Sequence, residues 1–347
     1  MASDIFIYKK EINRTMAHFL DEKCVSLSRT NPWAKDSINR LRLFATGGKS
    51  VRGNLLIHIA HSYGAPVTED LFSCAAAVEL FHSGFLIHDD IMDNDRLRRG
   101  QDTLFVQYEK EASSTIAKIS QFGQSMAICI ADASFFLANE LLSQLKDTEF
   151  TPRLLGKMSQ EFTRVCLAQM QDVSFGLSTR VPEEEEILSM YRCKTARYTF
   201  SLPFTIGAII AHVTEPEQSI LEHLGEELGI LFQIHDDMLN LFGDTKQTGK
   251  PVGSDLREQK KTLAYVSLYA AITKEERLQF QRLGQKPDDF MAYVYGLLAK
   301  YHIKELMQEK ENRYAENAGR LITELSLPQR EKNIMHDLIE FVRQRSN

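Results

Sequence analysis

The chain has 347 residues, of which 43% are hydrophobic, so it can bury a core of considerable size. Its formal net charge of -6 gives no overall attraction to nucleic acid or anionic lipid, and any affinity for anions must come from local clusters of Lys and Arg. Its 5 cysteines are scattered without CxxC spacing, which argues against a disulfide framework or a zinc site and favours a reducing, cytoplasmic compartment.

The N-terminal segment, residues 1–20, has charged side chains where a secretory signal peptide needs an unbroken apolar run. We therefore expect no secretion signal. The most apolar stretch, residues 199–213, is interrupted by Pro203 and His212 and is shorter than the roughly 20 residues of a membrane span. It predicts a buried core helix, and we expect no membrane span.

Apolar residues recur at spacings of three and four along almost the whole chain, and the alternating patterns typical of strands are rare. Pro and Gly divide this pattern into about ten helices. The breaks fall near residues 64–66, 151–152, 181–182, 214–216, 248–251 and 327–328. None of them is long and polar enough for an interdomain linker, and no repeat is evident. The sequence predicts an all-α, single-domain helical bundle over residues 1–347.

Residues 47–50, GGKS, share the Gly-Lys-Ser of a phosphate-binding loop. The earlier glycine that such a loop requires is replaced by Leu43, and no predicted strand precedes the segment. A nucleotide-binding loop is therefore not expected. Lys49 and Arg52 beside these glycines remain candidate ligands for an anion.

Residues 85–100, FLIHDDIMDNDRLRRG, place aspartates at the end of an apolar run and a pair of arginines shortly after them. On a helix, Asp89 and Asp93 lie one turn apart on the same face with Asp90 beside them, and like charges at this spacing oppose helix formation. A bound cation would compensate them. A solvated helix end is the better interpretation of a single cluster of this kind, so the case for a cation depends on a second cluster.

Residues 183–186 are consecutive glutamates that follow Pro182. Proline fits the first turn of a helix, and carboxylates there complement the helix dipole. We interpret this run as the start of a helix and not as part of a site.

Residues 232–250, FQIHDDMLNLFGDTKQTGK, repeat the earlier arrangement: a histidine precedes Asp236 and Asp237, and Asn240 follows one turn later. Two such clusters argue against chance. Helices that present carboxylates to each other would form a cage for a divalent metal, and hard oxygen ligands without a His or Cys cluster favour Mg²⁺. Because Mg²⁺ usually completes its coordination shell with substrate phosphates, the cage predicts a phosphorylated substrate.

Basic residues near the acidic clusters and the Gly-rich turns are candidate partners for phosphate, although each one alone is more often a solvated surface charge. They are Lys49, Arg52, Arg98, Arg99, Lys194, Arg197, Lys250, Lys260 and Lys261. A di-iron helical bundle is a rival carboxylate site, but it needs a Glu-x-x-His pair on two separate helices. Glu79 and His82 form the single pair of this kind, so the di-iron interpretation is weak.

These segments closely resemble those of the trans-isoprenyl diphosphate synthases, also called polyprenyl synthetases, and most of all the short-chain geranylgeranyl and farnesyl diphosphate synthases. The resemblance covers nearly the whole chain, through GGKSVRG, DDIMD with RLRRG, AQMQD at residues 168–172, KTARYTF, and FQIHDDMLNLFGD with TGK. It implies the all-α isoprenoid synthase fold, a deep central cavity across which the aspartate motifs face each other, and a homodimer. It also implies a Mg²⁺-dependent prenyltransferase that condenses isopentenyl diphosphate with allylic diphosphates, head to tail.

The resemblance carries roles to individual residues. The implied metal ligands are Asp89, Asp93 and Asp236, assisted by Asp90, Asp237 and Asn240, and about three Mg²⁺ ions are expected per active site with substrate bound. The residues implied for isopentenyl diphosphate are Lys49, Arg52, His82 and Arg99. Those implied for the allylic diphosphate are Arg98, Lys194, Thr195, Gln233, Lys250 and Lys260, with Gln169 and Asp172 in support. The residues implied to be catalytic are Lys194, Asp89, Asp93 and Asp236.

In the implied reaction, Mg²⁺ and basic residues stabilise the departing diphosphate, and the double bond of isopentenyl diphosphate attacks the allylic cation. Two alternatives stay open. A class I terpene cyclase shares the first aspartate motif, but it usually has an NSE-type second motif and lacks the basic residues for isopentenyl diphosphate. A regulatory subunit of a heteromeric synthase typically loses the aspartate motifs, which this chain keeps.

Product length is expected to depend on residues one and two helical turns before Asp89, because a turn of about 5.4 Å is close to the length of an isoprene unit. These residues are Phe85 and Phe81. Family members that stop at fifteen carbons commonly have an aromatic residue where this chain has Gly84. The sequence favours a C20 geranylgeranyl product, with C15 and C25 as alternatives, and predicts that Phe85→Ala lengthens the product and Gly84→Tyr shortens it. Ordinary core packing is an alternative interpretation of both phenylalanines.

Overall fold

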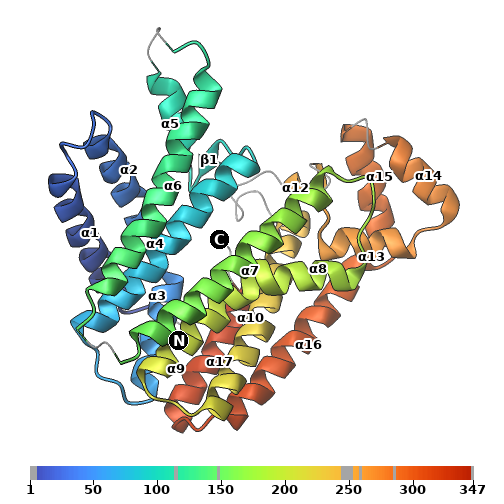
Figure 1. The fold of residues 1–347 in the computed structure, drawn as a ribbon. Helices are drawn as coiled ribbons and strands as arrows, with labels where there is room; N and C mark the ends of the chain where they lie inside the picture. The colour runs from blue at the N-terminus through green and yellow to red at the C-terminus, as the bar shows by residue number, and fades with distance from the viewer. Residues whose placement is uncertain are drawn as a thin grey trace. The chain divides into compact units, whose positions relative to one another are not determined.

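The computed structural model describes residues 6–112, 116–146, 149–243, 253–257, 260–283 and 287–344. Within these ranges the regular structure is almost entirely helical, and the only strands are the short pair β1 (Leu97–Arg98) and β2 (Gln101–Asp102) (Figure 1). The predicted all-α fold class is confirmed.

The chain divides by its internal contacts into two compact units. We call Ser3–Leu155 with Ile206–His212 the N-terminal unit, and Gly156–Thr205 with Val213–Asn347 the C-terminal unit. The single domain over residues 1–347 stays a prediction.

The N-terminal unit contains α1 (Lys9–Ser26), α2 (Ala34–Thr46), α3 (Val51–Ser62), α4 (Glu69–Met92), β1, β2, α5 (Leu104–Glu111) and α6 (Ile119–Ser143). The C-terminal unit contains α8 (Glu184–Tyr191), the π-helix η2 (Arg192–Ser201), α10 (Glu215–Phe242), α12 (Ser254–Arg257), α13 (Leu263–Ala271), α14 (Lys274–Leu283), α15 (Pro287–Lys300), α16 (Ile303–Glu324) and α17 (Gln329–Gln344). The boundary between the units falls within α7 (Thr151–Leu177) and α9 (Leu202–Ile210).

Helices α4 and α6 lie side by side in the N-terminal unit (Figure 1). α4 begins after Thr68, whose side chain accepts a hydrogen bond from the Leu71 amide at 3.2 Å and so satisfies one of the free donors of the first turn. Ser134 of α6 donates a hydrogen bond to the Leu80 carbonyl of α4 at 2.7 Å. These contacts hold α4, which carries the first aspartate motif, against α6.

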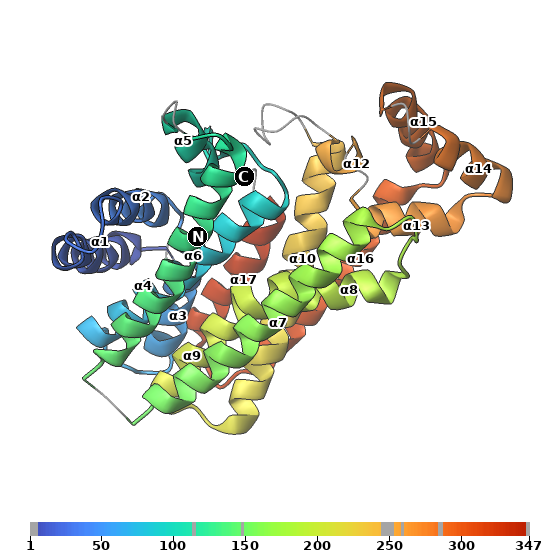
Figure 2. The same cartoon turned by 45° about the horizontal axis from the view of Figure 1, so that its top comes forward.

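Helix α10 packs against η2, α16 and α17 in the C-terminal unit, and Figure 2 shows α16 running beside it. It begins after Thr214 with Pro216 in its first turn, as the break at residues 214–216 predicts. Helix α8 begins with a capping box between Glu183 and Glu186, so the predicted helix start in the glutamate run is confirmed.

Both aspartate motifs lie at the C-terminal ends of long helices. Asp89 lies in the last turn of α4 and Asp93 caps it, while Asp236 and Asp237 lie in the last turns of α10. The helix dipole places negative charge at this end, so carboxylates there are unfavourable without cations. Helix stability therefore does not explain why aspartates occupy these positions, and we look to function for the explanation.

Residues 199–209 of the predicted core stretch are buried, with Phe200 1% and Phe204 0% exposed, whereas residues 210–213 are partly or fully exposed. In the described part of the chain, α4 and α6 are the helices long and apolar enough to cross a membrane, and 67% of the apolar window in α4 and 44% of that in α6 are buried inside the protein. Core helices meet the same criteria, so the absence of a membrane span stays a prediction. All 5 cysteines are free.

Candidate active site

The aspartates of the first motif differ in burial. Asp89 and Asp93 are partly exposed, whereas Asp90 is buried and accepts a hydrogen bond from Arg98 Nε at 2.5 Å. Among the described residues, the other carboxylate oxygen of Asp90 has no hydrogen-bond partner. Burial raises the pKa of Asp90 to about 7, although Arg98 acts to lower it. Asp90 thus positions Arg98 from inside the protein, and Asp89 and Asp93 offer the more accessible carboxylates.

A tight hairpin holds the two arginines that follow the motif. Strands β1 and β2 pair antiparallel, and Arg99 and Gly100 form the turn between them with φ angles of 54° and 74°. Positive φ at both positions is the requirement of a type I′ turn. The Arg99 side chain leaves this turn to donate a hydrogen bond to the Phe44 carbonyl at 3.2 Å, and its guanidinium lies over the Phe44 ring. Strands this short leave no alternating pattern, so the sequence does not predict them.

His82, Arg52 and Arg99, three of the residues predicted to bind isopentenyl diphosphate, interact in the N-terminal unit. His82 on α4 is surrounded by the charges of Arg52, Arg99 and Arg98. Burial, followed by these positive charges, holds the pKa of His82 well below its usual range. The imidazole is therefore neutral at neutral pH and can donate or accept a hydrogen bond without adding charge.

Glu79 is a member of this basic cluster that the sequence does not assign. Its buried carboxylate accepts a hydrogen bond from the Gly53 amide at 2.8 Å, and burial raises its pKa while Arg52 and Arg99 act to lower it. The one sequence feature that singled out Glu79 was its Glu-x-x-His spacing to His82, and this spacing is typical of a di-iron site. Lys49 is exposed in the turn before α3.

The second motif repeats the arrangement of the first. Asp237 is buried, its Oδ1 accepts a hydrogen bond from Gln233 Nε2 at 2.9 Å, and its Oδ2 accepts one from the Tyr191 hydroxyl. That hydroxyl in turn accepts a hydrogen bond from the Leu263 amide at 3.0 Å. Burial raises the pKa of Asp237 well above its usual range. In both motifs the second aspartate is buried and hydrogen-bonded, while the first, Asp236 here, is partly exposed.

Asn240 binds the backbone of residues 253–255. Its side-chain oxygen accepts a hydrogen bond from the Asp255 amide at 3.2 Å, and its carbonyl accepts one from the Gly253 amide at 2.7 Å. A small cavity of the C-terminal unit opens here, and its charged and amide side chains are Asp237, Asn240, Asp255 and Lys260. Asp255 is a carboxylate of this region that the sequence does not assign. Lys250, predicted to bind the allylic diphosphate, lies outside the described residues.

Lys194, Thr195 and Gln233, three of the residues predicted to bind the allylic diphosphate, lie beside the second motif, whereas Arg98 pairs with Asp90 of the first. Lys194 Nζ lies 2.5 Å from Asp172 Oδ2 on α7, and Thr195 Oγ1 donates a hydrogen bond to Gln233 Oε1 at 3.0 Å. Gln233 also donates a hydrogen bond to Asp237, so Thr195, Gln233 and Asp237 form one connected set. Lys194 and Thr195 belong to the π-helix η2, a form that occurs often at functional sites.

The predicted metal ligands are divided between the units. Asp89 and Asp93 belong to the N-terminal unit, and Asp236 and Asn240 belong to the C-terminal unit. Across the residues that the structure describes, no group of 3 or more His, Cys, Asp or Glu side chains is arranged to hold a metal ion. The donors on both helices are hard oxygens and fit Mg²⁺, and the cage that would join them stays a prediction.

Phe135 of α6 adds a further ring to the predicted chain-length residues. Its ring centroid lies 6.2 Å from that of Phe81 and 4.9 Å from that of Phe85. A Cβ atom at Gly84 would lie 2.5 Å from the Phe135 ring, so Phe135 fills the space that the glycine leaves. The substitution Gly84→Tyr must therefore displace this ring. The roles of Phe81, Gly84 and Phe85 in product length stay predictions.

The sequence of the chain matches that of a known family over most of its length. A profile described as Polyprenyl synthetase matches residues 33–297. The chain belongs to the polyprenyl synthetase family. Polyprenyl synthetases are in general Mg²⁺-dependent prenyltransferases, and the predicted family and enzyme class are confirmed.

Individual polyprenyl synthetases share long stretches with this one. A short chain isoprenyl diphosphate synthase of Methanocaldococcus jannaschii is 37% identical over 245 residues, which are 70% of this chain and 69% of that protein. A geranylgeranyl diphosphate synthase of Saccharolobus solfataricus is 32% identical over 311 residues, 83% of this chain and 88% of that protein.

The fold is also that of solved polyprenyl synthetases. A crystal structure of geranylgeranyl pyrophosphate synthase from Corynebacterium glutamicum, complexed with isoprenyl diphosphate and magnesium, has a TM-score of 0.89 and covers 98% of this chain and 99% of its own. The two sequences are 24% identical, so this likeness concerns the fold. The predicted isoprenoid synthase fold is confirmed.

Proposed function

We propose that this polyprenyl synthetase condenses isopentenyl diphosphate with allylic diphosphates, head to tail, to a short-chain all-trans prenyl diphosphate. The observation that carries the proposal is the basic cluster in which Arg52 and Arg99 surround His82 and Glu79. The site around Lys194 already provides for an allylic diphosphate. A second cationic site is needed only by an enzyme with a second diphosphate substrate, which a terpene cyclase does not have.

The residues divide the chemical work by charge. Mg²⁺, when bound, would stabilise the negative charge of the departing diphosphate, and about three ions would serve one site. Lys194 and Arg98 would hold the allylic diphosphate so that its C–O bond breaks while the leaving group stays bound. Arg52 and Arg99 would hold isopentenyl diphosphate with its double bond towards the cation. The proton released after C–C bond formation would pass to the free diphosphate, so no protein nucleophile is required.

A C20 geranylgeranyl diphosphate is the product that we favour. Geranylgeranyl diphosphate synthases are among the similar proteins, with 32% identity in the Saccharolobus solfataricus enzyme. Along α4, a chain that grows from the Asp89 end meets Phe85 one turn away and Phe81 two turns away, and Phe135 packs on both rings. Products of C15 and C25 are the alternatives.

We also propose a homodimer in a cytoplasmic compartment. Support for the dimer comes from large apolar side chains that α6 leaves uncovered, since Ile128 is 42% and Phe136 is 75% exposed. Apolar surface of this kind often marks an interface with another chain. Support for the compartment comes from the free thiols, which suit a reducing environment.

The test is an elongation assay with the purified protein, Mg²⁺, isopentenyl diphosphate and each of the C5, C10 and C15 allylic diphosphates, followed by sizing of the products. We expect all three primers to be extended and C20 to accumulate. No elongation with any primer overturns the proposal. Cyclised hydrocarbons formed without isopentenyl diphosphate would identify a terpene cyclase, and elongation only after addition of a second synthase chain would identify a regulatory subunit.

A further inference from the structure

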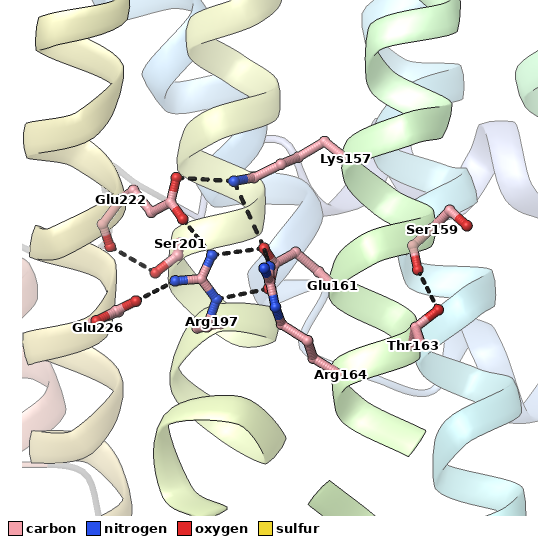
Figure 3. Close-up of polar contacts among 9 residues, drawn as sticks. All are labelled: Lys157, Ser159, Glu161, Thr163, Arg164, Arg197, Ser201, Glu222 and Glu226. Atoms are coloured by element: carbon pink, nitrogen blue, oxygen red, sulfur yellow. Dashed lines mark hydrogen bonds and ion pairs between the residues drawn. The ribbon is translucent and has the colours of Figure 1, made fainter. Parts of the chain in front are cut away.

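Arg197 on η2 is bound by carboxylates from two neighbouring helices (Figure 3). Its Nε and Nη2 donate to the two oxygens of Glu161 on α7 at 2.8 Å and 2.7 Å, and it also donates to Glu222 and Glu226 on α10. The Glu161 side chain is 0% exposed. We call Arg197 and these three glutamates the Arg197 cluster.

A contribution to folding stability does not by itself explain the Arg197 cluster. Ion pairs inside a protein give little net stabilisation, because the loss of hydration opposes the attraction between the charges, and they are better understood as devices that select one geometry. Arg197 joins α7 and α10 to the same segment that presents Lys194 and Thr195. Those two side chains contact the same pair of helices, through Asp172 on α7 and Gln233 on α10.

Glu226 binds both ends of one π turn. Its Oε2 lies 3.5 Å from Arg192 Nε, and its Oε1 accepts a hydrogen bond from Arg197. In an α-helix, residues five positions apart point about 140° away from each other, whereas π-helical hydrogen bonding links residues at this separation. A carboxylate that binds Arg192 and Arg197 together therefore favours the π form of the segment between them.

Glycines on α10 fix how closely η2 approaches. A Cβ atom at Gly229 would lie 2.2 Å from the Ala196 Cα, and one at Gly225 would lie 2.4 Å from the Ser201 amide nitrogen. The two backbones are thus in direct contact on both sides of Arg197. Because the backbones are in contact, η2 has little freedom to slide along α10. It can still differ in its winding, which is either π-helical or α-helical.

The winding determines where the functional side chains of η2 point. Relaxation of the π turn to α-helical winding would shift the register by one residue, which corresponds to a rotation of about 100°. Such a rotation would separate Lys194 from Asp172 or Thr195 from Gln233. We propose that the Arg197 cluster consists of positioning residues, which hold η2 in the π-helical register that presents Lys194 and Thr195 to the allylic diphosphate. This inference rests on the proposed function.

The first experiment compares kinetics of Arg197→Met with those of Arg164→Ala. Arg164 is a matched control, because its guanidinium also pairs with Glu161 but comes from α7 itself and is not bonded to η2. We expect Arg197→Met to raise the KM for the allylic diphosphate by about tenfold and to leave the KM for isopentenyl diphosphate within about twofold. Arg164→Ala should leave both values unchanged. Arg197→Lys should recover only part of the loss, because an ammonium cannot form the two-pronged contact with Glu161.

A double variant, Glu161→Leu with Arg197→Met, keeps the test valid if Arg197→Met alone does not fold. Apolar replacement of both partners of a buried ion pair often preserves stability, whereas loss of one partner does not, and here Glu222 keeps Lys157 and Glu226 keeps Arg192 as basic partners. The double variant should fold and still show the selective rise in the allylic KM. An unchanged allylic KM in a folded variant, or an equal rise in both KM values, overturns the inference.

Hydrogen exchange separates this inference from the proposed function. The backbone amides of residues 192–201 should exchange faster in Arg197→Met or in the double variant than in Arg164→Ala, because the contacts between Arg197 and the glutamates no longer hold the π turn. If the wild-type protein elongates no primer, the proposed function fails, and this exchange measurement still decides whether the cluster holds the register. Equal exchange in the variants and the control contradicts the inference whatever the activity.

Discussion

Asp89 and Asp90 have the same side chain, yet the fold gives them different environments. Asp90 is buried against Arg98, as Asp237 is buried against Gln233 in the second motif. Burial disfavours an ionised carboxylate, so each buried aspartate depends on its hydrogen-bond donors and fixes them in return. We infer that the second aspartate of each motif positions a side chain that we expect to bind substrate, and that the first is the one available to a metal ion.

His82 makes the stability of the N-terminal unit sensitive to acid. Its folded-state pKa is well below that of an unfolded histidine, which is about 6.5. Below this pH the unfolded chain binds a proton that the folded chain does not, so the free energy of unfolding falls as pH drops, by at most about 1.4 kcal/mol per pH unit. We predict that His82→Gln weakens this loss between about pH 7.5 and about pH 5.5, as measured by urea unfolding at both values.

The control for this prediction is His18→Gln on α1. The His18 side chain is 76% exposed, and its removal should leave the acid dependence of wild-type stability in place. If His82→Gln and wild type lose the same stability on acidification, His82 is not the cause.

The sequence singles out most of the charged residues in the candidate site, because two similar acidic clusters with basic residues nearby argue against chance, although their roles stay predictions. Glu79 and Asp255 were not recognised. Glu79 lies within the apolar sequence of α4, and its position among arginines arises when α3 packs against α4. Asp255 comes near the second motif through the backbone contacts of Asn240, which no spacing along the chain reveals.

Long helices such as α4 and α10 follow from apolar periodicity and from the predicted breaks at residues 64–66 and 214–216 that precede them, and the structure has both helices. The hairpin at Arg99 and the π-helix η2 do not follow from it. The hairpin contains too few residues to show a period, and η2 depends on partners such as Glu161 and Glu226, which are distant in the sequence. Elements whose geometry is set by tertiary contacts are thus the ones that local patterns do not predict.

The contact between α4 and α6 leads to a prediction about product length. Phe85 lies one turn before Asp89 and packs on Phe135, so removal of its ring would open the path along α4 by the length of about one isoprene unit. We predict that Phe85→Ala shifts the main product to one with about five more carbons, measured by chromatography of the dephosphorylated products.

Phe122→Ala is the matched control for Phe85→Ala. Phe122 also belongs to a cluster of rings, with centroids 5.8 Å from Trp33 and 6.3 Å from Tyr108, but its partners lie on the side of α2 and α5. The Phe122→Ala variant should lose packing contacts without a change in the chain length of the product. The same product from Phe85→Ala and from wild type would mean that Phe85 is an ordinary core residue.

Each unit of the molecule contains half of the predicted chemistry. The N-terminal unit holds Asp89 and the basic cluster, and the C-terminal unit holds Asp236 with Lys194 and Thr195. The pairing of these halves was predicted from the repetition of one motif, since like-charged helix ends have no reason to occur twice unless a cation joins them. Their relative placement depends on contacts that no local pattern encodes, and kinetics can test it.

If both aspartate motifs bind one metal cluster, the losses of kcat caused by a substitution in each motif should not be independent. Asp89→Asn removes a carboxylate charge from one side and Asp236→Asn from the other, and each should lower kcat by at least about a hundredfold while the protein stays folded. Because a cluster that has lost one ligand helix is already disabled, the double variant should be little worse than either single variant.

The control is Asp21→Asn, whose side chain pairs with Arg42 at 2.8 Å on the surface of the N-terminal unit and should not affect kcat. Circular dichroism of every variant should match that of wild type. If the two reductions in kcat multiply in the double variant, the effects on the activation free energy are additive. That result would show that Asp89 and Asp236 act at independent sites. Losses that stay at the level of the single variants would place both aspartates at one metal cluster.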